Sequence, residues 1–163
     1  MTSLESNVTS VGANVFYKDV ALQSVSFPNA TSIGTNAFRE CSALTSVNFP
    51  SVTTIQSEAF AYCKALTSAA FPSATSISGI VFDSCSQLTS LILSGNAVCT
   101  LANKSAFTGT PIASGTGYIY VPSALIDTYK AASNWSNFAS QFRALEDYTV
   151  DGTTTGELDE TKI

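Results

Sequence analysis

Apolar residues recur with a period of 22 residues in three consecutive blocks, which begin at Leu22, Leu44 and Leu66. Each block opens with Leu-x-Ser, an apolar residue, a small or polar residue and Phe-Pro. An isoleucine, an Ala-Phe or Val-Phe pair and a cysteine follow at fixed offsets. One block has too few apolar positions to offset the backbone entropy of its own ordering, so the blocks must stack. A repeat of this length therefore predicts a solenoid in which each block forms one coil.

The opening of each block has the two-residue alternation of a strand. In residues 44–49, Val47 and Phe49 are expected to face inward, and Ser46 and Asn48 outward. The proline that follows ends the strand, because it has no N–H to donate. A second extended piece, 52–55, leads into residues 58–62, which are too few for more than one or two helical turns.

The run Leu-x-x-Val-x-Phe-Pro, then Ile-Gly, Ala-Phe, Cys and the next Leu, resembles the BspA-like (Treponema-type) leucine-rich repeats of bacterial and some protozoan surface proteins. The resemblance covers about residues 4–110. It implies a right-handed solenoid used for adhesion or protein recognition, with no catalytic residues. The expected fold is mainly β with short helical turns, a leucine-rich-repeat solenoid of about four or five coils with a small α/β cap at its C-terminal end.

The predicted organisation has three parts: a solenoid over residues 1–110, a strand-helix-helix cap over 111–148 and a flexible acidic tail over 149–163. The solenoid divides into a degenerate first coil (4–21), regular coils (22–87) and an irregular last coil (88–110). In the first coil Glu5 takes the place of the inward Phe27, as an end coil with one wet face allows. Residues 108–117 are predicted to be a glycine-rich connector.

The cap begins with an expected strand, Tyr118 to Val121. Ser123 is the expected N-cap of a helix through Ala132, and a second helix is expected from Ser133 or Asn134. Leu125, Ile126, Tyr129 and Ala132 lie on one side of the first helix, and in the second helix Trp135, Phe138, Phe142 and Leu145 recur at intervals of three and four. The segment with Tyr-Val-Pro and Asn-Trp-Ser-Asn-Phe resembles the one that follows such repeats in gut-bacterial surface proteins. Its aromatics are interpreted as a cover for the open end of the last coil; the alternative is a sugar-stacking platform of Tyr118, Tyr120 and Trp135, which a buried Trp135 would exclude.

Three of the four cysteines, Cys41, Cys63 and Cys85, hold the same inward position of successive coils. Parallel Cβ vectors do not favour a disulfide, so a ladder of buried thiols is the preferred interpretation. The sequence has no CxxC and no histidine, which argues against a zinc site. Cys99 lies outside the ladder and is the strongest candidate for a reactive thiol, the alternative being a partly buried small side chain.

Charge excludes several kinds of partner. Charged residues make up 12% of the chain, the net charge is −5, and the seven Lys and Arg residues are scattered. Nucleic acid and anionic membrane surfaces are therefore not expected partners. Apolar runs are far shorter than the roughly 20 residues that span a bilayer, so membrane insertion is not expected either.

The family resemblance places the protein at the cell surface or among secreted proteins, yet no signal peptide is visible after Met1. A removed signal, another export route, and a role inside the cell or in a phage particle all remain open. Without histidine the usual general base is missing, and Glu40, Glu58 and Asp83 fall in outward turns. Neither enzymatic activity nor a cofactor or metal is expected.

The candidate site is the outward ladder of the expected concave sheet: Ser24, Ser26, Ser46, Asn48, Ser68, Ala70, Ser90 and Ile92. Its hydroxyls, and an exposed apolar end at Ala70 and Ile92, could meet a protein or a glycan; the alternative is that they only keep the strands soluble. We therefore expect a non-catalytic protein-binding or adhesion module of bacterial cell-surface type from a gut bacterium. Host extracellular or surface proteins are the candidate partners. The second hypothesis is a carbohydrate-binding or phage-type attachment module that uses the C-terminal aromatics.

Overall fold

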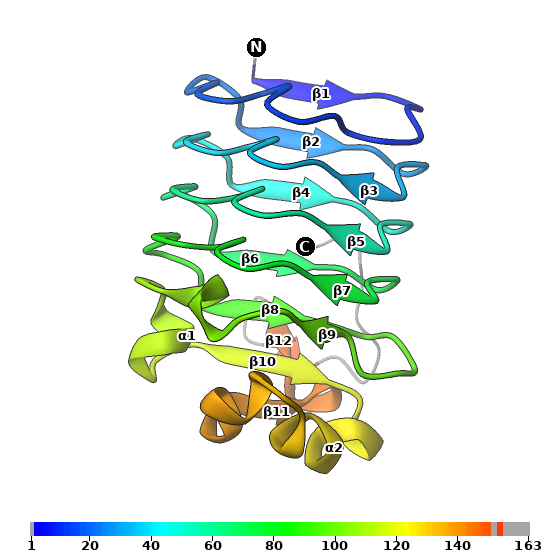
Figure 1. The fold of residues 1–163 in the computed structure, drawn as a ribbon, viewed down its shortest axis with the longest axis vertical. Coiled ribbons are helices and arrows are strands. Elements are labelled where there is room, and N and C mark those ends of the chain that lie inside the picture. The colour runs from blue at the N-terminus through cyan, green and yellow to red at the C-terminus, as the bar shows by residue number, and fades with distance from the viewer. Residues whose placement is uncertain (1, 151–152, 155–163) are drawn as a thin grey trace.

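The chain winds into a stack of coils, and each regular coil contributes one strand to each of two parallel sheets (Figure 1). The structure is a computed structural model that describes residues 2–150, 153 and 154. Strands at the same repeat position pair in register, as in Val25↔Val47 and Ile55↔Ile77. This stack is the solenoid that the 22-residue period predicts.

The long sheet runs the length of the stack. Its strands are β1 (Ser3–Glu5), β2 (Ser24–Ser26), β4 (Ser46–Asn48), β6 (Ser68–Ala70), β8 (Ser90–Ile92), β10 (Tyr118–Val121) and β11 (Phe142–Ala144). Hydrogen bonds join β1, β2 and β4 into one ladder and β6, β8, β10 and β11 into another. Strands β4 and β6 lie side by side and connect the two ladders (Figure 1).

The second sheet is narrower and faces the long sheet across the core. It consists of β3 (Ser32–Ile33), β5 (Thr54–Ile55), β7 (Ser76–Ile77) and β9 (Thr100–Leu101), paired in that order. In each strand the second residue is buried, and the first is exposed or half-buried. This is the alternation of a sheet with one face on the core.

Two columns of phenylalanine rings fill the space between the sheets. In the first, the ring centroids are 5.1 Å apart for Phe16–Phe38, 5.3 Å for Phe38–Phe60 and 5.7 Å for Phe60–Phe82. Phe107 continues this column, and Phe27, Phe49 and Phe71 form the second. Each fully buried ring stabilises the stack by roughly 1.5–3 kcal/mol.

A turn between the second sheet and the cysteine closes each regular coil. We call residues 13–18, 35–40, 57–62 and 79–84 the turn edge. Residues 58–62, for which the sequence allowed one or two helical turns, form hydrogen-bonded turns. Alternate N–H groups there donate to carbonyls of the next coil rather than to carbonyls of their own coil. Phe60 N–H donates to Val81 O at 3.0 Å, and Tyr62 N–H donates to Asp83 O at 2.8 Å. This direct pairing between coils leaves those donors unavailable for a helix.

The turn edge also has left-handed backbone at fixed positions. Positive φ angles occur at Asn14 and Lys18, Asn36 and Glu40, Glu58 and Tyr62, and Ile80 and Ser84. Such angles are uncommon for residues other than glycine. They recur with the same period as the core, which indicates that the coil geometry imposes them.

The predicted cysteine ladder is confirmed. Cys41, Cys63 and Cys85 are free and 0% exposed. Each thiol donates to the phenylalanine carbonyl of the preceding coil, for example Cys63 Sγ to Phe38 O at 3.1 Å. Burial raises the pKa of Cys85 to about 12. The ladder is therefore a set of protonated, inert side chains in the core.

Cys99, the candidate for a reactive thiol, is instead the small buried side chain of the alternative interpretation. Its side chain is 1% exposed, and burial raises its pKa to about 12. A reactive thiol needs access to solvent and a lowered pKa. The cap encloses Cys99, so the thiol has neither access to solvent nor a lowered pKa.

The chain from β1 to β2 is one residue shorter than the 22-residue repeat that separates the strands of the regular coils. Leu4 pairs with Val25 and Glu5 with Ser26, an offset of 21 rather than 22 residues. Glu5 is therefore exposed on the outside of the sheet and does not take the inward place of Phe27, as the unbroken period suggested. The shorter connection keeps the carboxylate in water, where it needs no partner.

Residues 108–117, predicted as a connector, form a closely packed turn after the short helix η1 (Lys104–Phe107). Helix α1 (Pro111–Ser114) begins after Thr110, whose Oγ1 accepts from Ala113 N–H at 3.2 Å. Ile112 is 1% exposed in the core. A Cβ atom on Gly117 would lie 2.8 Å from Ile112 N, so this glycine is needed for close packing. The segment is thus part of the stack.

The cap continues the stack and closes its end. Strand β10 pairs with β8 in register, so it takes the place of another coil's strand. The helical pieces that follow are η2 (Ser123–Leu125), α2 (Ile126–Ala131), η3 (Trp135–Gln141) and η4 (Leu145–Asp147). Of these, η2, α2 and η3 lie below the last coil in Figure 1. Trp135 and Phe138 contact Phe107 at centroid distances of 5.9 Å and 5.2 Å, which covers the end of the phenylalanine column.

Two details of the predicted cap helices were wrong. Ser123 starts a short 3-10 turn and its side chain caps no helix. The expected second helix ends at Gln141, and Phe142 begins β11, which pairs with the otherwise open edge of β10. Filling that edge satisfies backbone groups and still buries Phe142, so sheet pairing overrides the helical spacing.

The predicted flexible tail, 149–163, lies mostly outside the described residues. Within it, β12 (Thr149–Val150) and β13 (Thr153–Thr154) form a short antiparallel pair.

Candidate binding face on the long sheet

The predicted ladder residues lie on one side of the long sheet, pointing away from the core. We call this side the outer face. Ser24↔Ser46 and Ser68↔Ser90 form one column, and Ser26↔Asn48 and Ala70↔Ile92 form its neighbour. Parallel register explains the columns, because it places equivalent residues of successive coils side by side. The columns extend to Ser3 and Glu5 at the first coil and to Tyr118, Tyr120 and Arg143 in the cap.

The part of the outer face on β1, β2 and β4 is open to solvent. Asn48 is exposed, and Ser24, Ser26 and Ser46 are half-buried. Asn48 Nδ2 donates to Ser26 Oγ at 2.9 Å. Among the residues that the structure describes, nothing covers this part, which we call the open half.

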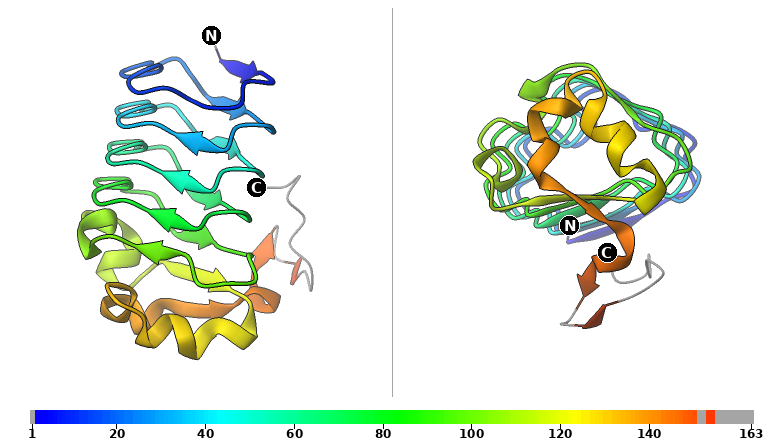
Figure 2. Two further views of the ribbon diagram at one scale, coloured as in Figure 1. Left: turned by 45° about the vertical axis from the view of Figure 1, so that its right-hand side comes forward. Right: turned by 90° about the horizontal axis from the view of Figure 1, so that it is seen from below.

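The other half, on β6, β8 and β10, is covered by the chain itself. The prediction of an exposed apolar end was wrong, since Ala70 is 8% exposed and Ile92 is 0% exposed. Residues 145–148, which we call the strap, follow β11 and lie against this face (Figure 2). Tyr148 packs on Ala70 and Ile92, and its ring centroid is 4.9 Å from that of Tyr120.

The three aromatics of the predicted sugar platform do not come together. Tyr118 and Tyr120 lie on the outer face, and the Arg143 guanidinium is 4.5 Å from the Tyr118 ring centroid. Trp135 lies on the opposite side of the sheet and is 0% exposed. Its Nε1 donates to Cys99 O at 2.6 Å. A buried tryptophan cannot stack on a sugar, so the platform is excluded.

The outer face carries little charge. Burial raises the pKa of Tyr148 and of Tyr120, so both phenols are neutral at physiological pH. In the open half, Glu5 adds one acidic side chain at the first coil. This face therefore offers hydrogen-bonding groups and shape rather than a charged patch.

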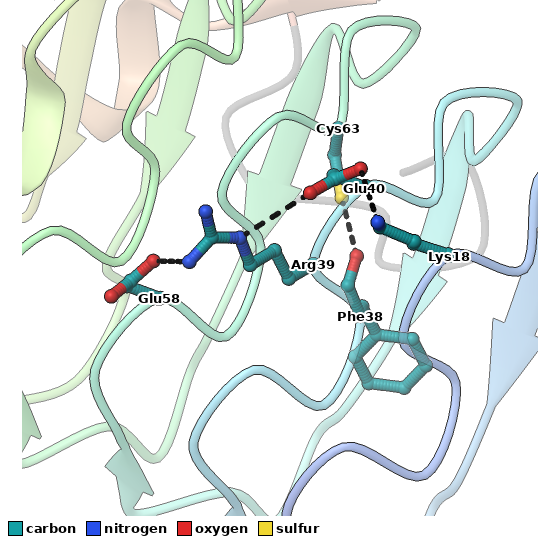
Figure 3. Close-up of polar contacts among 6 residues, drawn as sticks. All are labelled: Lys18, Phe38, Arg39, Glu40, Glu58 and Cys63. Carbon is teal, nitrogen blue, oxygen red and sulfur yellow. Dashed lines mark hydrogen bonds and ion pairs between the residues drawn. The ribbon is translucent and has the colours of Figure 1, made fainter.

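Charged side chains gather instead at the turn edge (Figure 3). Arg39 pairs with Glu58 through Nη1, and its Nε is 3.6 Å from Glu40. Lys18 Nζ is 3.9 Å from the same Glu40 carboxylate. These groups balance one another's charge, and half-exposed pairs of this kind contribute about 0–1 kcal/mol each. Glu40 and Glu58 thus lie on the surface, as the sequence indicated.

Sequence reasoning missed a role for many of the hydroxyl residues. Thr53 Oγ1 donates to Thr31 O at 3.1 Å, and Thr75 Oγ1 to Thr53 O at 3.1 Å. Thr31 and Thr100 make the equivalent bonds. The recurrence of threonine at one offset was the available signal. These side chains bind the coils to one another and are not free for a ligand.

No group of three or more His, Cys, Asp or Glu side chains within the described residues could hold a metal ion. In the same part of the chain, every helix is too short or too polar to cross a membrane.

Comparison with solved structures shows what the fold resembles. The T. pallidum leucine-rich repeat protein TpLRR superposes with a TM-score of 0.63 at 26% identity, over 74% of this chain. A leucine-rich repeat protein from Bacteroides ovatus gives 0.69 at 22% identity, over 88% of this chain. A leucine rich cell surface protein from Faecalibacterium prausnitzii gives 0.68 at 24% identity, over 86%. These likenesses confirm the prediction of a mainly β leucine-rich-repeat solenoid.

This chain spans only part of those proteins: 57% of the T. pallidum chain, 36% of the B. ovatus chain and 35% of the F. prausnitzii chain. Among curated proteins, no sequence matches it. The family model of the BspA type leucine rich repeat region matches residues 9–132 in six copies, which confirms the resemblance drawn from the repeat. The chain belongs to the BspA-type leucine-rich-repeat family.

Proposed function

We propose that this protein is a non-catalytic protein-binding module of bacterial cell-surface type, with its binding site on the open half of the outer face. The family supports this proposal, because its repeats build an elongated surface of the kind that solenoids use for binding. A solved relative of similar fold is described as a cell surface protein. We further propose that the partner is a host extracellular or surface protein, bound in adhesion.

The main support comes from how the hydroxyls are used. Thr53, Thr75 and Ser51 donate to backbone carbonyls of the preceding coil. Among the described residues, Ser24 and Ser46 have no such partner, although they share the same repeat. Their hydroxyls, with the Oδ1 of the Asn48 amide, can bind the backbone or polar side chains of a partner, while Asn48 Nδ2 donates to Ser26 Oγ.

The size and charge of the open half also favour a protein partner. It is flat and lined mainly by small uncharged side chains, with Glu5 at the first coil, and its described residues include no cluster of Lys or Arg that would attract phosphates. A flat surface excludes the enclosed pocket that a small ligand needs.

The proposal can be tested with arginine substitutions on the open half. Wild-type protein, Ser46→Arg and Asn48→Arg would be assayed by surface plasmon resonance against purified host extracellular matrix and epithelial surface proteins. An unpaired arginine in a flat interface should weaken binding by about tenfold or more. Ser42→Arg is the matched control, because Ser42 is an exposed serine in a loop away from the sheet.

All variants should keep the thermal stability of the wild type, since the substituted side chains lie outside the core. If a bound protein is held equally well by Ser46→Arg and wild type, the site is elsewhere. If no protein of the panel binds the wild type, the adhesion proposal fails.

A further inference from the structure

The strap occupies a site whose residues differ from the rest of the outer face. Along one column the residues change from polar to apolar in the order Glu5, Ser26, Asn48, Ala70, Ile92 and Tyr120, before Arg143 ends the column. The change falls where the Tyr148 ring lies. Ala70 provides the space for that ring, and Ile92 and Tyr120 provide apolar contact.

The contacts of Tyr148 are those of a specific aromatic subsite. Its ring meets Tyr120 edge to face, at 69° between planes and 4.9 Å between centroids. Burial raises the pKa of the Tyr148 phenol, and the nearby Ser68 side chain opposes that rise, which places a polar group at the rim of the site. Ala70 and Ile92 lie beneath it, in paired strands. Apolar walls, an edge-to-face ring and one polar group at the rim together recognise a tyrosine side chain.

This cluster is separate from the interior core. Tyr148, Ala70 and Ile92 pack on the outer face, whereas the phenylalanine columns lie on the other side of the sheet. The strap is one short 3-10 turn, with a long contact of 3.5 Å between Ser123 Oγ and Glu146. Removing the strap would leave the coils intact, and segments with so few contacts open at low free-energy cost.

We propose that this cluster is a binding subsite for an aromatic side chain of the protein partner, and that Tyr148 holds it in the free protein. The inference rests on the proposed function, because the subsite adjoins the open half where β6 lies beside β4. A partner that extends from Asn48 towards Ala70 reaches the Tyr148 ring. Tyrosine is among the residues that contribute most to protein interfaces, so a partner tyrosine is the expected competitor.

Occupation by Tyr148 lowers the apparent affinity of the partner. If the strap is open in about one molecule in a hundred, the apparent affinity falls about a hundredfold. The partner must therefore compete with the chain's own residue, and loss of that residue should strengthen binding.

The test uses full-length Tyr148→Ala protein and a small probe, N-acetyl-tyrosinamide, at millimolar concentration. Binding is followed by two-dimensional amide NMR spectra. The amide signals of residues 68–70, 90–92 and 118–120 should shift with saturation in the variant and stay unchanged in the wild type. Tyr17→Ala, which removes an exposed tyrosine of the first coil, is the matched control and should behave like the wild type. Unchanged core signals in Tyr148→Ala will show that the stack remains folded.

Absence of saturable shifts in Tyr148→Ala, or equal shifts in both proteins, overturns the subsite. N-acetyl-glycinamide, which has no ring, should produce no shifts; if it does, aromatic recognition is also overturned. In the Tyr148→Ala background, Ser68→Ala should weaken N-acetyl-tyrosinamide but not N-acetyl-phenylalaninamide. Because the probe requires no partner, its failure rejects the subsite alone, and the arginine substitutions on the open half still decide the proposed function.

Discussion

The first prediction concerns the phenylalanine column, on which the stack depends. Phe60 is 0% exposed and lies between Phe38 and Phe82, with centroid distances of 5.3 Å and 5.7 Å. It also contacts Phe49 and Phe71 of the second column at 6.2 Å and 6.0 Å. Phe60→Ala removes contacts to both neighbouring coils at once. We expect a loss of about 3–5 kcal/mol in the free energy of unfolding.

Phe16 holds the same repeat position in the first coil and serves as the internal comparison. Its ring contacts Phe38 at 5.1 Å and Phe27 at 6.0 Å, is half-buried, and is stacked on one side. With about half the contacts, Phe16→Ala should cost roughly 2 kcal/mol. Val20→Ala is the surface control, at 63% exposure, and should cost less than about 0.5 kcal/mol.

The assay is guanidinium denaturation followed by circular dichroism and by tryptophan fluorescence. The single tryptophan, Trp135, is buried in the cap and reports on the end of the stack opposite to Phe16. Coincident curves from the two signals would show that the stack unfolds as one unit. The reasoning is refuted if Phe60→Ala costs less than about 2 kcal/mol, or if it costs no more than Phe16→Ala.

Three further predictions concern buried polar groups. A thiol reagent at pH 8 should leave the cysteines of the folded protein unmodified and modify them in guanidinium. Because burial raises the pKa of Cys41 to about 11 and of Cys85 to about 12 from 9.0, unfolding releases protons at high pH. The free energy of unfolding should therefore fall as pH rises from about 9 towards 11, and a flat profile would disprove this. Trp135→Phe keeps a ring but leaves Cys99 O unpaired, so it should cost about 1–3 kcal/mol in the same denaturation assay; a loss below about 0.5 kcal/mol would mean that the hydrogen bond is unimportant.

The repeated part of the fold could be predicted because its signal is local and recurs. Val47 and Phe49 alternate with Ser46 and Asn48, and the same pattern returns every 22 residues. A cysteine at one fixed position of a coil can only form a ladder when coils stack in register. These expectations required only the period and the preference of apolar side chains for the core.

The turn edge could not be predicted in detail, because its backbone depends on the neighbouring coil. The positive φ angles at Glu58 and Tyr62 follow from N–H groups that reach Val81 and Asp83. The preferences of single residues favour other conformations there. Phe142 presents the same difficulty, since its helical spacing from Phe138 was outweighed by the open edge of β10.

The covered half of the candidate site could not be predicted for a similar reason. The period correctly placed Ala70 and Ile92 on the outer face, but it gave no information about Tyr148, which lies beyond the repeats. A contact between a repeat and a segment outside the period leaves no pattern in the sequence. In the open half, where no such segment intervenes among the described residues, the predicted residues lie on the outer face, and their role in binding stays a prediction.

The direction of the hydrogen bonds along the turn edge gives the stack two unlike ends. N–H groups of an earlier coil donate to carbonyls of the later one, as Asn14, Phe16 and Lys18 do to Thr35, Ala37 and Arg39. The carbonyls of Ala13, Val15 and Tyr17 hold the accepting positions of the first coil, and no described residue donates to them. Two molecules that met through their first coils would set carbonyl against carbonyl along this edge. Mutual repulsion of those dipoles disfavours head-to-head contact between two first coils, although exposed valines lie around these carbonyls.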